Sequence, residues 1–171
     1  MHTLEPLTLA DGALVRTATD QDIPAILALI QALADYEREP DAVENTPELL
    51  EQALFADDSV AFCHVVEQQD AVVGIALWFR SYSTWTGLTG IWLEDLFVLP
   101  EHRGSGYGRA LLVSLARVAQ LNGYGRLEWT VLDWNEPSIR FYRAMGAQPM
   151  SEWTTQRLDA VAIDRVAALQ A

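Results

Sequence analysis

The sequence predicts one mixed α/β domain over residues 1–171, with a mostly antiparallel first half and a strand-helix-strand unit behind it. Three observations support this class. A chain of 171 residues fits one domain of common size. Apolar runs separated by a short polar turn predict paired strands in the first half. In the second half, an amphipathic helix lies between two further apolar runs.

The first half is expected to contain strands and two helices. Apolar residues repeat at helical spacing from Ile23 to Leu33, and Thr19 or Asp20 can cap that helix. Pro47 suits the first position of the second helix. The expected elements are a strand at 13–19, helices at 19–37 and 45–55, two strands within 60–81 joined by a turn at 68–70, and a strand at 91–99.

The second half alternates helices and strands. Leu111, Leu112 and Leu115 share one face of a helix, and Gly146 ends a later helix. For the tail, a dimer contact and a frayed terminus both stay open. The expected elements are helices at 106–121 and 135–145, strands at 126–132 and 153–159, and a short helix within 160–171.

Composition excludes several classes of function. The chain has 24 acidic and 11 basic residues, a formal net charge of -13, and every basic residue is arginine. Such a charge repels nucleic acid. Without lysine, neither a Schiff-base lysine nor a P-loop lysine exists. No signal peptide, membrane span or internal disulfide is expected, which favours a cytoplasmic protein.

A glycine-rich turn, "RGSGYGR" at residues 103–109, lies between an apolar strand and an amphipathic helix. Gly104, Gly106 and Gly108 allow several backbone N–H groups to point toward one ligand at a helix N-terminus. This pattern predicts a phosphate-binding turn, although a simple tight turn stays open. The spacing fits neither the Rossmann fingerprint nor the P-loop.

Two motifs resemble those of the GCN5-related N-acetyltransferase (GNAT) family. "VLPEHRGSGYGRALL" resembles the Arg/Gln-x-x-Gly-x-Gly/Ala signature, and "DWNEPSIRFYRAMGA" resembles the second signature, in which an asparagine opens a helix. "ADYERE", "STWTG" and "LEDLFV" are similar to the diamine (spermidine/spermine) and thialysine branch. The resemblance implies the GNAT fold: a mixed central sheet, helices on both faces, and a splayed parallel strand pair that binds acetyl-CoA.

The resemblance also implies which residues bind the co-substrate acetyl-CoA. Backbone groups of the first strand would hold the pantetheine arm, amides of the turn the pyrophosphate, and the second motif the rest of the CoA arm. No metal is implied. The implied contacts are Leu96, Phe97, Val98, Arg103, Gly104, Ser105, Gly106, Tyr107, Gly108, Arg109, Asn135, Ser138 and Tyr142.

Two adjacent carboxylates, Glu94 and Asp95, interrupt an otherwise apolar strand. An alkylammonium must lose its proton before it attacks a thioester, which costs roughly 4 to 5 kcal/mol at pH 7. Neighbours on a strand face opposite ways. The family match assigns the substrate side and the proton-accepting role to Glu94, directly or through water, and leaves Asp95 a structural role with an arginine or a backbone N–H. The alternative places both acids at an exposed strand edge.

Tyr142 lies seven residues after Asn135, on the same helix face. The resemblance implies that Tyr142 protonates the departing CoA thiolate, whereas helical spacing alone would also fit a core tyrosine. The match weakens after Gly146, where the acidic pair of the animal polyamine enzymes is missing. The residues expected to bind the amine are Tyr36, Glu37, Glu94, Glu128, Trp129 and Glu152.

The predicted function is acetyl transfer from acetyl-CoA to a primary amine of a small cation, by direct attack in a ternary complex. Diamines, polyamines and thialysine-like amines all stay open as substrates, and a homodimer is expected. Two alternatives remain: a protein or peptide N-acetyltransferase, and a non-catalytic acyl-CoA sensor. Cys63 and His64 lack further ligands at metal spacing, so packing roles are expected for them.

Overall fold

The computed structural model describes residues 5–169, which divide after Thr130 into two compact units. The first unit contains the sheet and three of the α-helices, and the second contains the C-terminal part of the chain. No helix among these residues is long and apolar enough to cross a membrane. The expectation of one domain stays a prediction.

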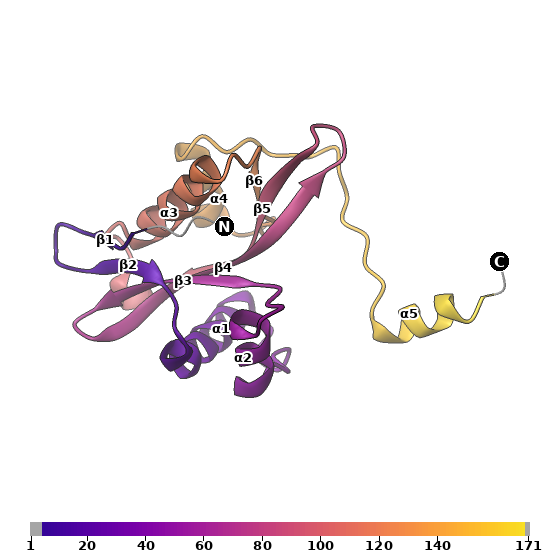
Figure 1. Ribbon diagram of the computed structural model, residues 1–171, viewed down its shortest axis with the longest axis horizontal. Helices are drawn as coiled ribbons and strands as arrows, with labels where there is room; N and C mark the ends of the chain where they lie inside the picture. Colours follow the sequence, from indigo (N-terminus) through magenta and orange to yellow (C-terminus); the bar gives the residue numbers. More distant parts are fainter. Residues whose placement is uncertain (1–4, 170–171) are drawn as a thin grey trace. The chain divides into compact units, whose positions relative to one another are not determined.

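The first unit is built on a six-stranded mixed sheet in which the strands follow one another in chain order (Figure 1). All neighbours are antiparallel except β5 and β6, which are parallel. The expected mixed sheet is therefore confirmed. The strands are β1 (Leu7–Thr8), β2 (Leu14–Thr17), β3 (Phe62–Gln68), β4 (Ala71–Ser83), β5 (Leu88–Val98) and β6 (Leu127–Glu128).

The strands differ from the expectation in two respects. β1 was not expected from the sequence, because a strand of two residues is too short to show an alternation of apolar and polar side chains. β6 covers only two of the seven residues expected, because its parallel pairing with β5 ends at Trp92 and Glu128. β5 continues to Val98 without it. The two parallel strands thus stop pairing partway along β5.

Helices cover both faces of the sheet, as expected (Figure 1). The side chain of Ile75 on β4 packs in the cluster formed with α1 and α2. At the neighbouring Gly74, an added Cβ would point the other way and meet Leu111 of α3 at 3.6 Å. The helical elements of this unit are η1 (Asp20–Asp22), α1 (Ile23–Glu37), α2 (Pro47–Phe55), η2 (Pro100–His102) and α3 (Tyr107–Leu121).

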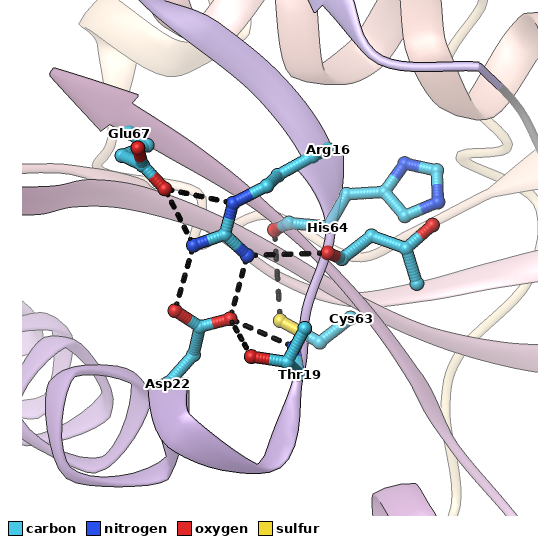
Figure 2. Close-up of polar contacts among 7 residues, drawn as sticks. Arg16, Thr19, Asp22, Cys63, His64 and Glu67 are labelled. Carbon is cyan, nitrogen blue, oxygen red and sulfur yellow. Dashed lines mark hydrogen bonds and ion pairs between the residues drawn. The ribbon is translucent and has the colours of Figure 1, made fainter. Parts of the chain in front are cut away.

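The start of α1 is fixed to the sheet by Arg16 (Figure 2). Its guanidinium donates to both carboxylate oxygens of Asp22, at 2.6 and 2.9 Å, and its Nε donates to Glu67 at 2.8 Å. The Asp22 carboxylate also accepts from the backbone N–H and the hydroxyl of Thr19. Hydrogen bonding to Arg16 lowers the pKa of Asp22. This network joins β2, β3 and η1, and so determines where α1 begins.

The second unit contains α4 (Glu136–Ala144) and α5 (Ala160–Ala167). Asn135 caps α4 by accepting a hydrogen bond from the backbone N–H of Ser138, at 3.3 Å. The expected helices are therefore present within the described residues. The expected strand at 153–159 is wrong, since these residues pair with no strand in the described chain and have no regular secondary structure.

The buried side chain of His64 is expected to make the folded protein less stable at acidic pH. Its Nδ1 lies 2.8 Å from the hydroxyl of Ser114, which itself donates to the carbonyl of Leu111, so Nδ1 is the protonated donor nitrogen. Burial lowers the pKa of His64 to about 4. In the unfolded chain, His64 therefore becomes protonated below about pH 6.5, whereas in the folded chain it stays neutral down to about pH 4.

We expect the free energy of unfolding to fall by roughly 2 kcal/mol between pH 7.5 and pH 5 through this group. Urea unfolding at the two pH values measures the change. His64→Gln keeps a side chain able to hydrogen-bond but cannot titrate, so its loss on acidification should be smaller by a similar amount. An equal loss in both proteins would contradict the assignment.

Candidate active site

A β-bulge places Glu94 and Asp95 on the same side of the sheet. β4 pairs Trp78 with Leu93 but Leu77 with Asp95, which leaves Glu94 as an extra residue on β5. Leu77 packs against the α1 cluster, so Asp95 opposite it faces α1 as well. The expectation that the two carboxylates face opposite ways is wrong, because the extra residue interrupts the alternation.

Asp95 is a half-buried carboxylate among other acids. Burial, with smaller contributions from the charges of Glu94 and Glu37, raises the pKa of Asp95 to about 6. None of the ion pairs among the described residues includes Asp95. The structural pairing with an arginine expected for Asp95 is therefore absent from that part of the chain.

Glu94 is exposed and oriented by a tryptophan. Trp92, two residues earlier on the same strand, donates its indole N–H to Glu94 Oε2 at 2.9 Å. The ring of Trp92 in turn lies near that of Phe79, with centroids 6.4 Å apart. One carboxylate oxygen of Glu94 is thus held in place, while the group as a whole is exposed to solvent.

The last turn of α1 supplies two of the residues expected at the amine site. Tyr36 and Glu37 are half-buried, and burial raises the pKa of Glu37. Tyr36 packs toward the end of β5, with its ring centroid 6.4 Å from that of Phe97. The structure therefore brings Tyr36, Glu37, Glu94 and Asp95 to the α1 side of β5.

The glycine-rich turn has the backbone expected of an anion-binding loop. Gly104 and Gly106 have φ of 83° and 86°, values that favour glycine, and an added Cβ at either would meet no atom within 4 Å. The first three amides of α3 lack helical acceptors. Among the described residues, no backbone carbonyl outside helices and strands accepts from the amides of residues 104–106. The turn can therefore offer several N–H groups to one ligand.

One side chain of the turn, Tyr107, bonds to another part of the protein. Tyr107 is buried, and its hydroxyl donates to Asp11 at 2.7 Å. Burial, together with this hydrogen bond, raises the pKa of Tyr107 to about 12.

A surface pocket of about 640 Å³ lies beside the turn, between the β1–β2 connection and the first turns of α3, with Ser105 and Arg109 in its wall.

The end of β5 has one edge paired and one edge open. Leu96, Phe97 and Val98 pair with β4 along one edge. No described strand pairs with the other edge beyond Trp92. Backbone groups along that edge can therefore meet an extended ligand. The carbonyl of Val98, by contrast, already accepts from the Nε of Arg103 at 2.9 Å.

The other expected site residues lie in or after β6. Glu128 forms an ion pair with Arg126, 2.6 Å between Oε2 and Nε, and Trp129 is half-buried beside it in the chain. In the second unit, Tyr142 is half-buried on α4, with its ring 5.2 Å from that of Phe141, and Ser138 is half-buried on the first turn. Glu152 is exposed in a turn.

Comparison with known proteins identifies the class of this fold and site. Residues 26–147 match the model of the "Acetyltransferase (GNAT) family". Bovine (Bos taurus) thialysine N-epsilon-acetyltransferase is 37% identical over 165 residues, which cover 90% of this chain and 96% of that protein. The human (Homo sapiens) spermidine/spermine N(1)-acetyltransferase-like protein 1 is 32% identical over 151 residues, 84% of this chain and 22% of that protein.

Solved structures share the fold. An integron cassette protein from the mobile metagenome of V. cholerae aligns with a TM-score of 0.77 at 22% identity, covering 92% of this chain and 98% of that one. An aminoglycoside acetyltransferase from a soil metagenomic sample aligns with a TM-score of 0.73 at 15% identity, covering 86% and 97%.

The chain belongs to the acetyltransferase (GNAT) family and is an N-acetyltransferase, within the branch that includes the thialysine enzymes. Enzymes of this family use acetyl-CoA. Among the described residues, no group of three or more His, Cys, Asp or Glu side chains could hold a metal ion. Asp95 is the residue whose position sequence reasoning missed, since no local signal in the sequence marks the bulge.

Proposed function

We propose that this protein transfers the acetyl group of acetyl-CoA to a primary amine of a small cationic molecule. One observation carries the proposal: three carboxylates, Glu37, Glu94 and Asp95, gather on one side of β5, and the end of β5 contacts Arg103 of the glycine-rich turn. In a GNAT acetyltransferase, this arrangement offers an ammonium group a negatively charged site next to the coenzyme.

The described residues fit acetyl-CoA. The open edge of β5 at Leu96–Val98 would hold the pantetheine arm, and the amides of the turn that Arg103 begins would hold the pyrophosphate. Asn135 and Ser138 of the second motif would contact the arm as the resemblance implies. Acetyl-CoA supplies an acetyl group activated as a thioester.

Proton transfer is assigned to two side chains. Glu94 would accept the proton of the bound ammonium, directly or through water, because its carboxylate is exposed and oriented by Trp92. Asp95 would strengthen the binding of the cation through its charge. Tyr142 would donate its hydroxyl proton to the departing sulfur of CoA. The amine attacks in a ternary complex, so no covalent enzyme intermediate forms.

The substrate class follows from the acids and the relatives together. Relatives named thialysine N-epsilon-acetyltransferase in cattle, pigs and mice cover 90% or more of this chain. Their named substrate is a lysine-like amine, which suits a site with several carboxylates. Of the other residues expected to bind the amine, Tyr36, Trp129 and Glu152 stay proposals. Glu128 could bind the amine only after its ion pair with Arg126 breaks.

A screen of CoA thiol release tests the proposal. Acetyl-CoA is mixed with thialysine, lysine, diamines, polyamines and short peptides, and free thiol is measured against time. Release with small amines but not with peptides is expected. Turnover confined to peptides would indicate a protein acetyltransferase, and stabilisation by acetyl-CoA without turnover of any amine would indicate a sensor. The homodimer and the cytoplasmic location stay predictions. Light scattering, which measures the mass of the particle in solution, tests the first of them.

A further inference from the structure

The side chain of Arg103 connects two parts of the proposed site. Its guanidinium carbon lies 4.8 Å from the ring centroid of Tyr36 and 5.3 Å from that of Phe97, and its Nε donates to the carbonyl of Val98. Tyr36 belongs to the last turn of α1, and Phe97 and Val98 to the end of β5. One side chain therefore joins that turn of α1 to the end of β5.

These contacts engage one in-plane donor and the faces of the Arg103 guanidinium. A guanidinium grips a phosphate through a planar fork of N–H donors. Here Nε is committed to Val98, and two aromatic rings lie against the planar group within cation–π distance. Arg103 is exposed, so these contacts rather than burial hold its side chain in place.

The position of Tyr36 matters for the carboxylates. Glu37 follows Tyr36 directly in the chain, and the charge of Glu37 acts on Asp95. The backbone leaves the helix immediately afterwards, at Arg38, which has a left-handed φ of 69°. A last helical turn is free to fray unless side chains anchor it. The Tyr36 ring, in contact with both Arg103 and Phe97, is such an anchor.

We infer that Arg103 is a positioning residue for the amine side of the site: it holds Tyr36 and the last turn of α1 against the end of β5, so that Glu37 stays close to Asp95. This inference rests on the proposed function. In this inference, the Arg103 side chain orders the amine site, and the backbone amides of residues 104–109 bind the phosphate.

Arg103→Gln tests the inference. Glutamine also occurs at this position of the family signature and can still donate to Val98, but it places no cation over the two rings. We expect the KM for the amine to rise about three- to tenfold, with the kcat and the Kd for ADP within about twofold of the wild type. ADP serves as the probe of the phosphate-binding turn. Arg117→Gln, which removes an exposed charge on α3, is the matched control and should change none of these values.

A double-mutant cycle with Tyr36 shows whether Arg103 acts through that ring. In the background of Tyr36→Leu, Arg103→Gln should add no further rise in the KM for the amine. In the background of Tyr36→Phe, which keeps the ring, most of the rise should remain. Additive effects in the leucine background would overturn the inference. So would a weaker Kd for ADP with an unchanged KM for the amine, or no change in either.

Hydrogen exchange gives a readout that does not need turnover. Arg103→Gln should speed the exchange of backbone amides at residues 33–38, whereas Arg117→Gln should not. Unchanged exchange would overturn the inference. If the wild type released no CoA thiol with any amine, the proposed function would fail, and the exchange rates would still decide the positioning role of Arg103.

Discussion

Replacing Tyr142 by phenylalanine is expected to lower kcat at least tenfold, equivalent to a rise of about 1.4 kcal/mol or more in the barrier. The change removes only the hydroxyl that we propose protonates the departing sulfur, and leaves the ring on α4. Because the proposed role concerns the reaction and not binding, the Kd for acetyl-CoA should stay within about twofold. Steady-state kinetics and calorimetric titration of acetyl-CoA provide the two measurements.

Two controls distinguish a lost proton donor from a disturbed helix. Phe141→Leu alters the neighbouring ring, 5.2 Å away, without touching the hydroxyl, and should reduce kcat far less. The melting temperature of Tyr142→Phe should match that of the wild type. If the phenylalanine variant kept full turnover, Tyr142 would have no acid role, whatever the effect on stability.

Glu94→Gln is expected to lower kcat/KM for the amine at least tenfold near pH 7 and to move the rise of kcat/KM with pH to higher pH. The amide keeps a hydrogen-bonding group for Trp92 but neither attracts the ammonium strongly nor accepts its proton. Without that acceptor, the reaction depends on the small fraction of amine that is already neutral in water. Initial rates from pH 5.5 to 9.5 measure both effects.

The direction of the pH shift separates Glu94 from Asp95. The charge of Glu94 contributes to the raised pKa of Asp95, about 6, so its removal lowers that pKa. If Asp95 accepted the proton, the rise of kcat/KM in Glu94→Gln would move to lower pH, opposite to our expectation. Asp95→Asn completes the comparison: it should raise the KM for the amine while the rise of kcat/KM with pH stays in place.

The fold was largely predictable because its determinants are local. The alternation of β3 and β4 and the polar turn between them appear in the sequence as a period of two and a break. The helical repeat of α1 and the glycines before α3 are equally local signals. The strand expected at 153–159 failed because apolar and β-branched residues predict extended backbone, while a strand also needs a neighbour with which to pair.

The candidate site was less predictable, since it depends on register. The glycine-rich turn could be predicted from its residues, and two of its three glycines, Gly104 and Gly106, have left-handed backbone. The direction of Asp95 could not, because a bulge is defined by how two strands align and not by the letters of one strand. The contact of Arg103 with Tyr36 joins residues that are far apart in the chain, so no pattern of spacing in the sequence predicts it.

The extra residue in β5 makes the length of this segment as important as its chemistry. Deleting either residue between Leu93 and Leu96 would remove the bulge and restore regular pairing with β4, so that one carboxylate instead of two would face α1 while the later side chains of the strand kept their faces. Two homologous proteins could therefore both carry an acidic residue here and still differ in activity. An alignment that allows a gap at this point would conceal the difference.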